Sequence, residues 1–174
     1  MDTCNPIKLP YGTDFKLTKE MEASTEEEKK QMAETPYRSL VGSILYLQLT
    51  RPDIAYAVKE LSRFLINPGP KMWLAAKNVL KYLKGTASHG IRFGGRASYN
   101  TLAASPSHLV GYSDSDWAGC RATGKSTRGG STMIGSNFIK GYSRTQSHVT
   151  MSSAIAELTA LAKCTAESMG EISM

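Results

Sequence analysis

The chain has few of the residues on which small secreted domains and metal-binding modules depend. Its 174 residues include three cysteines and three histidines. The cysteines are odd in number and far apart, a pattern that argues against both a disulfide framework and a zinc site and predicts a reducing compartment. The histidines share no metal-ligand spacing, so we expect them at the surface or at caps.

Long apolar runs are also lacking. No run approaches the roughly 18 residues that can cross a bilayer. The N-terminal segment is acidic and polar rather than basic and apolar. The sequence therefore predicts neither a signal peptide nor a membrane span.

Acidic residues are scarce beyond the first 35 positions. Residues 1–35 contain five lysines and eight acidic residues, a net charge of −3, whereas the rest of the chain has 16 basic and 7 acidic residues, a net charge of +9. A basic body attracts polyanions, of which nucleic acid is the usual one. Solvated lysines on helix faces are the alternative explanation.

The first half of the chain has the apolar spacing of helices. Ser24 and Glu27 match a capping box and predict a short, polar helix over residues 24–34, which follows an extended arm over residues 1–22. Three longer helices are expected next: one after the N-cap Thr35 and Pro36, one between Arg51 and Asn67, and one from about Lys71 to Lys84. We place them in one helical module over residues 36–95.

Three lysines lie on one face of the last of these helices. Lys77, Lys81 and Lys84 are spaced at i, i+4 and i+7, which brings their ammonium groups to the same side. Either this row is a solvated surface, or it contacts the phosphate backbone of a nucleic acid.

The spacing changes in the second half of the chain. After a possible short strand over residues 89–93 and a linker over residues 96–106, apolar residues alternate with a period of two. We predict strands at residues 109–113, 129–134 and 138–143, a hairpin turn at 135–137 and a helix at 152–169. The predicted fold class is therefore α+β: after the acidic arm and short helix of residues 1–35, a helical module precedes three antiparallel strands and one helix in residues 107–174.

The stretch GCRATGKST at residues 119–127 matches the G-x-x-x-x-G-K-[ST] pattern of a phosphate-binding P-loop. A working P-loop opens a helix, whose N-terminus helps to hold the phosphates. The residues after Lys125 include two glycines and β-branched side chains, which favour a strand. We therefore expect no nucleotide at residues 119–126. The basic residues here, Arg121, Lys125 and Arg128, either neutralise phosphates or lie in solvent.

Three carboxylates are candidates for a metal site. Asp114 and Asp116 end an apolar strand, and a period of two places both on one face. Carboxylates at a strand end suit Mg²⁺, which takes oxygen ligands, and an Asp pair that caps a turn is the alternative. Glu157 lies among the alanines and leucines of the last helix, where a charged residue without a partner is uncommon, so it is the stronger functional candidate.

Six segments resemble, in order, landmarks of the copia-type retrotransposon polyprotein. They are YRSLVGSILY at 37–46, TRPDIAYAV at 50–58, WLAAKNVLKYLKG at 73–85, GYSDSDWAG at 111–119, KST at 125–127 and SSAIAEL at 152–158. The resemblance spans roughly residues 36–170 and covers the end of the reverse transcriptase, the connecting segment and the start of the ribonuclease H domain. Because the match is ordered, it is far more specific than any single motif.

The resemblance implies roles for the acidic residues. The ribonuclease H of that family uses four carboxylates to bind two Mg²⁺ ions and cuts the RNA strand of an RNA–DNA hybrid. By resemblance, Asp114 would be the first carboxylate and Glu157 the second. Asp116 corresponds to an accessory position that is not a metal ligand. The metal ligands expected in this chain are therefore Asp114 and Glu157, with Mg²⁺ bound weakly or not at all.

The chain also departs from the family pattern. The third and fourth carboxylates belong to a later strand and a later helix, which we expect beyond Met174, and Ile155 stands where the family commonly has a Glu. The polymerase palm with its paired aspartates is absent from this sequence. We therefore expect a retrotransposon-derived fragment, with the first half of a ribonuclease H-like fold, that is not catalytically competent alone.

Two other functions remain open from the sequence. In the first, the chain is a recruited structural or docking subunit, and a protein partner covers the exposed edge of its sheet and its N-terminal arm. In the second, it is a non-catalytic nucleic-acid-binding module that holds an RNA–DNA hybrid through the lysine row and the segment from Arg121 to Arg128.

Overall fold

The chain divides into two compact units, Met1–Gly90 and Ile91–Met174. The computed structural model describes residues 3–12, 16–94, 108–120 and 123–172. The linker predicted over residues 96–106 lies outside the described residues. Among the described residues, no helix is both long and apolar enough to cross a membrane.

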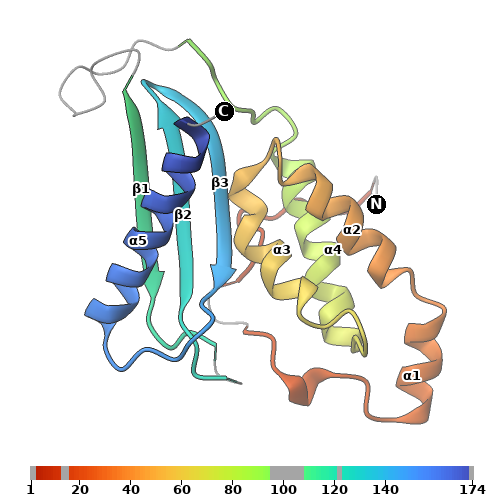
Figure 1. Cartoon of the computed structure of the whole chain (residues 1–174). Coiled ribbons are helices and arrows are strands. Elements are labelled where there is room, and N and C mark those ends of the chain that lie inside the picture. The colour runs from red at the N-terminus through yellow and green to blue at the C-terminus, as the bar shows by residue number, and fades with distance from the viewer. Residues whose placement is uncertain (1–2, 13–15, 95–107, 121–122, 173–174) are drawn as a thin grey trace. The chain divides into compact units, whose positions relative to one another are not determined.

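The first unit is helical, as the spacing predicts. Its α-helices are α1 (Glu26–Ala33), α2 (Tyr37–Leu47), α3 (Ala55–Ser62) and α4 (Pro70–Gly85), with short 3-10 helices η1 (Lys19–Met21) and η2 (Pro52–Ile54) (Figure 1). The helices bury one apolar stripe each. The least exposed large side chains of the unit are Tyr37, Val41, Ile44, Ile54, Val58, Leu61, Met72 and Val79.

The capping box of α1 lies one residue further along the chain than predicted. Thr25, not Ser24, is the N-cap: its hydroxyl accepts the N–H of Glu28 at 3.2 Å, and the Glu28 carboxylate accepts the N–H of Thr25 at 3.3 Å. The sequence offers both registers, because Ser24 and Thr25 each have a Glu three residues later. The structure has the register of Thr25 and Glu28, in which the Glu28 carboxylate also accepts the N–H of Ser24 at 2.9 Å.

Thr35 does not cap α2, so that prediction is wrong. The N-cap of α2 is Pro36, which offers no side-chain hydrogen bond. The Thr35 hydroxyl instead donates to the carbonyl oxygen of Gln31 at 2.9 Å, at the end of α1. In a connection this short, the Thr35 hydroxyl can either cap the start of α2 or donate to a free carbonyl oxygen at the end of α1. Here it does the second.

Residues of the predicted arm contribute to the core of the first unit. Leu17 is 3% exposed and belongs to the cluster of buried apolar residues in this unit. The Tyr11 hydroxyl accepts the N–H of Leu17 at 3.0 Å, and burial raises the pKa of Tyr11 to about 12. The segment before α1 is therefore packed against the helices at these positions.

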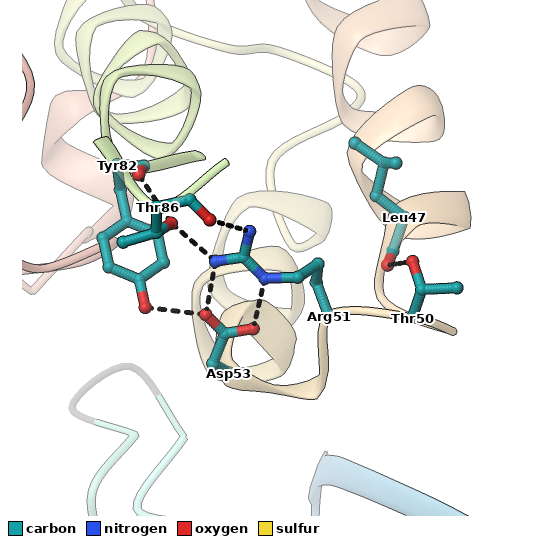
Figure 2. A network of polar contacts seen from close by, with 6 residues as sticks. All are labelled: Leu47, Thr50, Arg51, Asp53, Tyr82 and Thr86. Atoms are coloured by element: carbon teal, nitrogen blue, oxygen red, sulfur yellow. Dashed lines mark hydrogen bonds and ion pairs between the residues drawn. The ribbon is translucent and has the colours of Figure 1, made fainter. Parts of the chain in front are cut away.

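A polar network joins the start of η2 to the end of α4 (Figure 2). The Arg51 guanidinium donates two hydrogen bonds to the Asp53 carboxylate, at 3.0 and 2.8 Å, and a third to the carbonyl oxygen of Thr86 at 3.0 Å. The Tyr82 hydroxyl donates to Asp53 at 2.6 Å. The hydrogen bonds from Arg51 hold the pKa of Asp53 below its usual value. The network therefore fixes both charged side chains against the end of α4.

The second unit is a three-stranded antiparallel sheet with one helix, as predicted. Its elements are β1 (Leu109–Asp116), β2 (Thr127–Ile134), β3 (Asn137–Thr145) and α5 (Ser153–Ile172), in the strand order β1-β2-β3 (Figure 1). The register pairs Asp114 with Gly129, and Gly129 with Ser143. The strand predicted over residues 89–93 is wrong: the segment has no regular structure. It has no neighbouring strand in the described sheet, and Gly90 interrupts its short apolar run.

Helix α5 packs on the sheet through small side chains. Ala156, Ala160 and Cys164, spaced by four residues, are at most 3% exposed. The larger apolar residues Leu158 and Leu161 are 65% and 53% exposed instead. Small residues face the sheet because they let the helix approach the strands closely. The most apolar residues of a helix therefore do not by themselves identify its buried face.

Candidate functional site

Asp114 lies near the C-terminal end of β1, on the sheet face opposite α5. Side chains alternate along a strand. A Cβ on Gly111 would lie 3.0 Å from the Sγ of Cys164 in α5, so residues 111, 113 and 115 face the helix and Asp114 faces away from it. Its carboxylate is exposed and makes no hydrogen bond or ion pair with the described part of the chain. Asp114 is thus available to a ligand from solvent.

Glu157 reaches the same strand from α5. Its Oε1 accepts the backbone N–H of Ser115 at 3.2 Å. Strand β1 is at the edge of the described sheet. The hydrogen bond brings the Glu157 carboxylate to the residue next to Asp114, from the other side of the sheet.

Asp116 has a different setting. A Cβ on Gly119 would collide with the Asp116 carboxylate, and would lie 3.0 Å from its Oδ1, so this side chain lies against the backbone of the turn that follows β1. Ala118 in that turn has a positive φ of 53°, a conformation in which non-glycine residues are uncommon. The side chain of Asp116 therefore packs against the turn, whereas that of Asp114 projects from the strand.

Backbone N–H groups of the loop that matches the P-loop pattern donate to carbonyl oxygens of the same loop. The N–H of Cys120 donates to the carbonyl oxygen of Lys125 at 3.1 Å, and the N–H groups of Thr123 and Gly124 donate to that of Cys120 at 3.2 and 2.8 Å. The loop leads into strand β2, which confirms the strand predicted after Lys125. A phosphate cradle needs N–H groups directed at the ligand. The N–H groups of Cys120, Thr123 and Gly124 already have partners within the loop. That no nucleotide binds here stays a prediction. Arg121 lies outside the described residues.

Ser126 connects this loop to the elements that carry the carboxylates. It is fully buried. Its hydroxyl accepts the N–H of Ala118 at 3.2 Å and shares a hydrogen bond with the Thr150 hydroxyl at 2.9 Å. Its carbonyl oxygen accepts the N–H of Gln146 at 2.8 Å. The sequence identified the Lys-Ser-Thr segment only as a landmark. In the structure, its serine joins the end of β1 to the connection before α5.

The lysine row on α4 is partly engaged within its own unit. The Lys77 ammonium lies 5.7 Å from the centre of the Trp73 ring. The Lys84 ammonium donates to the carbonyl oxygen of Cys4 at 2.8 Å, and Lys81 is half-buried. The row therefore lies on one helix as predicted, but at least two of its charges also serve contacts inside the chain.

Arg128 is directed toward α5 rather than toward solvent. Its side chain is 15% exposed and lies 3.9 Å from the Glu167 carboxylate. Lys140 and Arg144 of β3 approach the same carboxylate at 3.4 and 3.5 Å. The structure thus uses Arg128 to attach α5 to the sheet and does not group it with Lys125, which is half-buried in the loop.

Asp114 and Glu157 offer the oxygen atoms that a hard divalent cation prefers. One oxygen of Glu157 is oriented by the Ser115 N–H, and the Asp114 carboxylate is exposed. Within the described ranges, no three His, Cys, Asp or Glu side chains gather so that they could hold a metal ion. The donor atoms of these two side chains are thus of the type that suits Mg²⁺, and a magnesium site here stays a prediction.

No protein-family model and no solved structure matches the chain. It is similar to the retrovirus-related Pol polyproteins of transposon TNT 1-94 from Nicotiana tabacum, 40% identical over 92% of this chain, and of transposon RE2 from Arabidopsis thaliana, 39% identical over 96% of it. This chain spans 11% and 10% of those relatives. It is also 40% identical, over 79% of its length, to the secreted RxLR effector protein 161 of Plasmopara viticola, and spans 92% of that protein.

The identities to the Pol polyproteins extend over nearly the whole chain, across both units. The helical module, sheet and final helix also follow one another in the order that the six landmark segments predict. The chain therefore belongs to the copia-type retrotransposon Pol polyprotein family.

Proposed function

We propose that this chain contributes Asp114 and Glu157 as two carboxylate ligands of a metal-dependent, ribonuclease H-like nuclease site. One observation carries the proposal: Glu157 accepts the N–H of Ser115, the residue that follows Asp114. The two acids are 43 residues apart in the sequence. Through this bond, strand and helix present both carboxylates at one end of β1.

The chemistry of the two side chains supports this role. Both side chains provide carboxylate oxygens, which a hard divalent cation prefers as ligands. The Ser115 N–H fixes the orientation of Glu157 without neutralising its charge. When bound, a pair of Mg²⁺ ions activates a water and stabilises the leaving oxygen. The proposed substrate is the RNA–DNA hybrid that the family resemblance implies.

The proposal assigns this chain half of a site. By the family resemblance, four carboxylates hold the two metal ions, and Asp114 and Glu157 account for two of them. A pair of ligands binds Mg²⁺ weakly, because most coordination positions stay with water. We therefore propose that residues 1–174 bind the metal but do not cleave the hybrid by themselves.

Metal binding can be tested on the full chain with Mn²⁺, which takes similar oxygen ligands and broadens nearby NMR signals. We expect titration with Mn²⁺ to broaden the amide signals of residues 114–116 and 156–158 first. Asp114→Asn and Glu157→Gln should each weaken this binding by about 10-fold or more, because each removes one of two ligands. Asp116→Asn is the matched control and should change the apparent affinity by about twofold at most, because Asp116 lies against the turn.

The alternative outcomes are distinct. If Mn²⁺ broadens other regions first, or if Asp116→Asn weakens binding as much as Asp114→Asn does, the assignment of the two ligands is wrong.

A further inference from the structure

Gln146 is a buried polar residue between the two elements of the proposed site. It follows the last residue of β3 and is 2% exposed. Its backbone N–H donates to the carbonyl oxygen of Ser126 at 2.8 Å. Polar side chains are rarely this deeply buried unless hydrogen bonds fix them, so its side-chain contacts indicate its role.

The side-chain amide of Gln146 donates in two directions. Its Nε2 lies 2.9 Å from the carbonyl oxygen of Ala156 in α5 and 3.2 Å from the hydroxyl of Ser115 in β1. A carbonyl oxygen only accepts, so the contact to Ala156 determines which end of the amide is the nitrogen. The Oε1 atom is then buried without a partner among the described residues.

Both partners of Gln146 are sequence neighbours of the proposed metal ligands. Ser115 follows Asp114, and Ala156 precedes Glu157. Ser115 is also the residue whose N–H the Glu157 carboxylate accepts at 3.2 Å. One amide group therefore connects the residue after Asp114 in β1 to the residue before Glu157 in α5.

We infer that Gln146 is a positioning residue, which fixes α5 against the end of β1 and thereby sets where the Glu157 carboxylate lies relative to Asp114. This inference rests on the proposed function. Ligands of a metal ion must be held within about 0.5 Å of their productive places. Glu157 is exposed and attached to β1 by a single hydrogen bond, so its place depends on the contact between helix and strand beside it.

A purely packing role does not account for this residue. Methionine or leucine would fill a similar volume at position 146. Neither has a side-chain carbonyl oxygen, whereas the buried Oε1 of Gln146 has no partner among the described residues, which is unfavourable. The observed amide instead makes two directed contacts that apolar side chains cannot make. The two hydrogen bonds of Gln146 therefore fix the position of α5 on β1, although an apolar side chain would be the more favourable one to bury here.

The test compares Gln146→Met with wild type in the full chain, by the Mn²⁺ titration and by thermal unfolding. Gln146→Met keeps the volume and removes both donated hydrogen bonds, so we expect the apparent Mn²⁺ affinity to fall by about 10-fold. Ser115→Ala removes one of the two acceptors and keeps the N–H to Glu157, so a smaller loss of about threefold is expected. This second variant is informative even if the first fails to fold.

Cys164→Ala is the control for a general loss of packing between α5 and β1. Cys164 is 3% exposed and donates to the carbonyl oxygen of Tyr112 at 3.4 Å, about two helical turns from Glu157. It should lower the unfolding temperature and leave the Mn²⁺ affinity within about twofold.

The inference is overturned if Gln146→Met and Ser115→Ala keep the wild-type affinity, or if Cys164→Ala weakens binding as much as they do. Those results leave the proposed function intact as long as Asp114→Asn still loses binding. If Asp114→Asn binds Mn²⁺ like wild type, the proposed function itself fails.

Discussion

Replacing Gly69 with alanine should destabilise the helical unit by roughly 3 kcal/mol or more, within the range of severe overpacking. A Cβ at this position would collide with the carbonyl oxygen of Met21 and lie 3.0 Å from the Met21 carbonyl carbon and 3.2 Å from that of Glu22. These are backbone atoms, which cannot turn aside as a side chain can. The added methyl group must therefore displace either the start of α4 or the segment that contains η1.

Gly42→Ala is the matched control for Gly69→Ala. Gly42 lies inside α2, and a Cβ there would have no other atom within 4 Å. Because alanine is the better helix former, this substitution should stabilise the unit by about 0.5–1 kcal/mol. Amide hydrogen exchange of α2 and α4 measures both changes within the same unit. Equal stability of the two variants would contradict the packing of η1 against the start of α4.

Gly130→Ala should have the second large effect, in the sheet. A Cβ on Gly130 would lie 2.5 Å from the Cζ and Oη atoms of the Tyr142 ring, which crosses it from β3. The ring is only 9% exposed and has the guanidinium groups of Arg128 and Arg144 within 5.9 and 5.4 Å of its centre. Because the ring has little room to move, we expect a loss of about 2–3 kcal/mol.

The neighbouring glycine is the control for this prediction. A Cβ on Gly129 points to the other face of the sheet, where its nearest atom is the carbonyl oxygen of Tyr142 at 3.9 Å. Gly129→Ala should therefore change stability by less than about 0.5 kcal/mol. Hydrogen exchange of the β2 amides distinguishes the two variants. A loss in Gly129→Ala as large as that in Gly130→Ala would mean that the faces of β2 are assigned wrongly.

Much of the fold follows from local patterns. The apolar spacing predicts α2, α3, α4 and the three strands, because each element buries one face of a regular period. The two capping errors arose where neighbouring residues offer equivalent choices. Ser24 and Thr25 both match a capping box, and Thr35 can serve the helix on either side. Such choices depend on geometry that the local sequence does not contain.

The final helix shows the limit of composition as a guide to packing. Leu158 and Leu161 are more apolar than Ala156 and Ala160, yet the alanines face the sheet. The distance between helix and sheet decides which face is buried, and that distance is set by contacts far away in the sequence.

The two candidate carboxylates could be chosen from the sequence, but their surroundings could not. Glu157 stands out because a charged residue is uncommon on an apolar helix face, whereas Asp114 is distinguished from Asp116 only by the family resemblance. Gln146 gave no signal, since its partner Ser115 lies 31 residues away and a polar residue after a strand is common. The pairing of Arg128 with Glu167 depends in the same way on how α5 crosses the sheet.

Cleavage of an RNA–DNA hybrid by the purified chain, with Mg²⁺ and separately with Mn²⁺, tests the central claim most directly. The account predicts no cleavage of the RNA strand above the level without protein, because in the proposed site Asp114 and Glu157 would be only two of the four carboxylates that the family resemblance implies. Robust cleavage by the wild-type chain that is lost in Asp114→Asn would contradict it, since the chain would then hold a complete site.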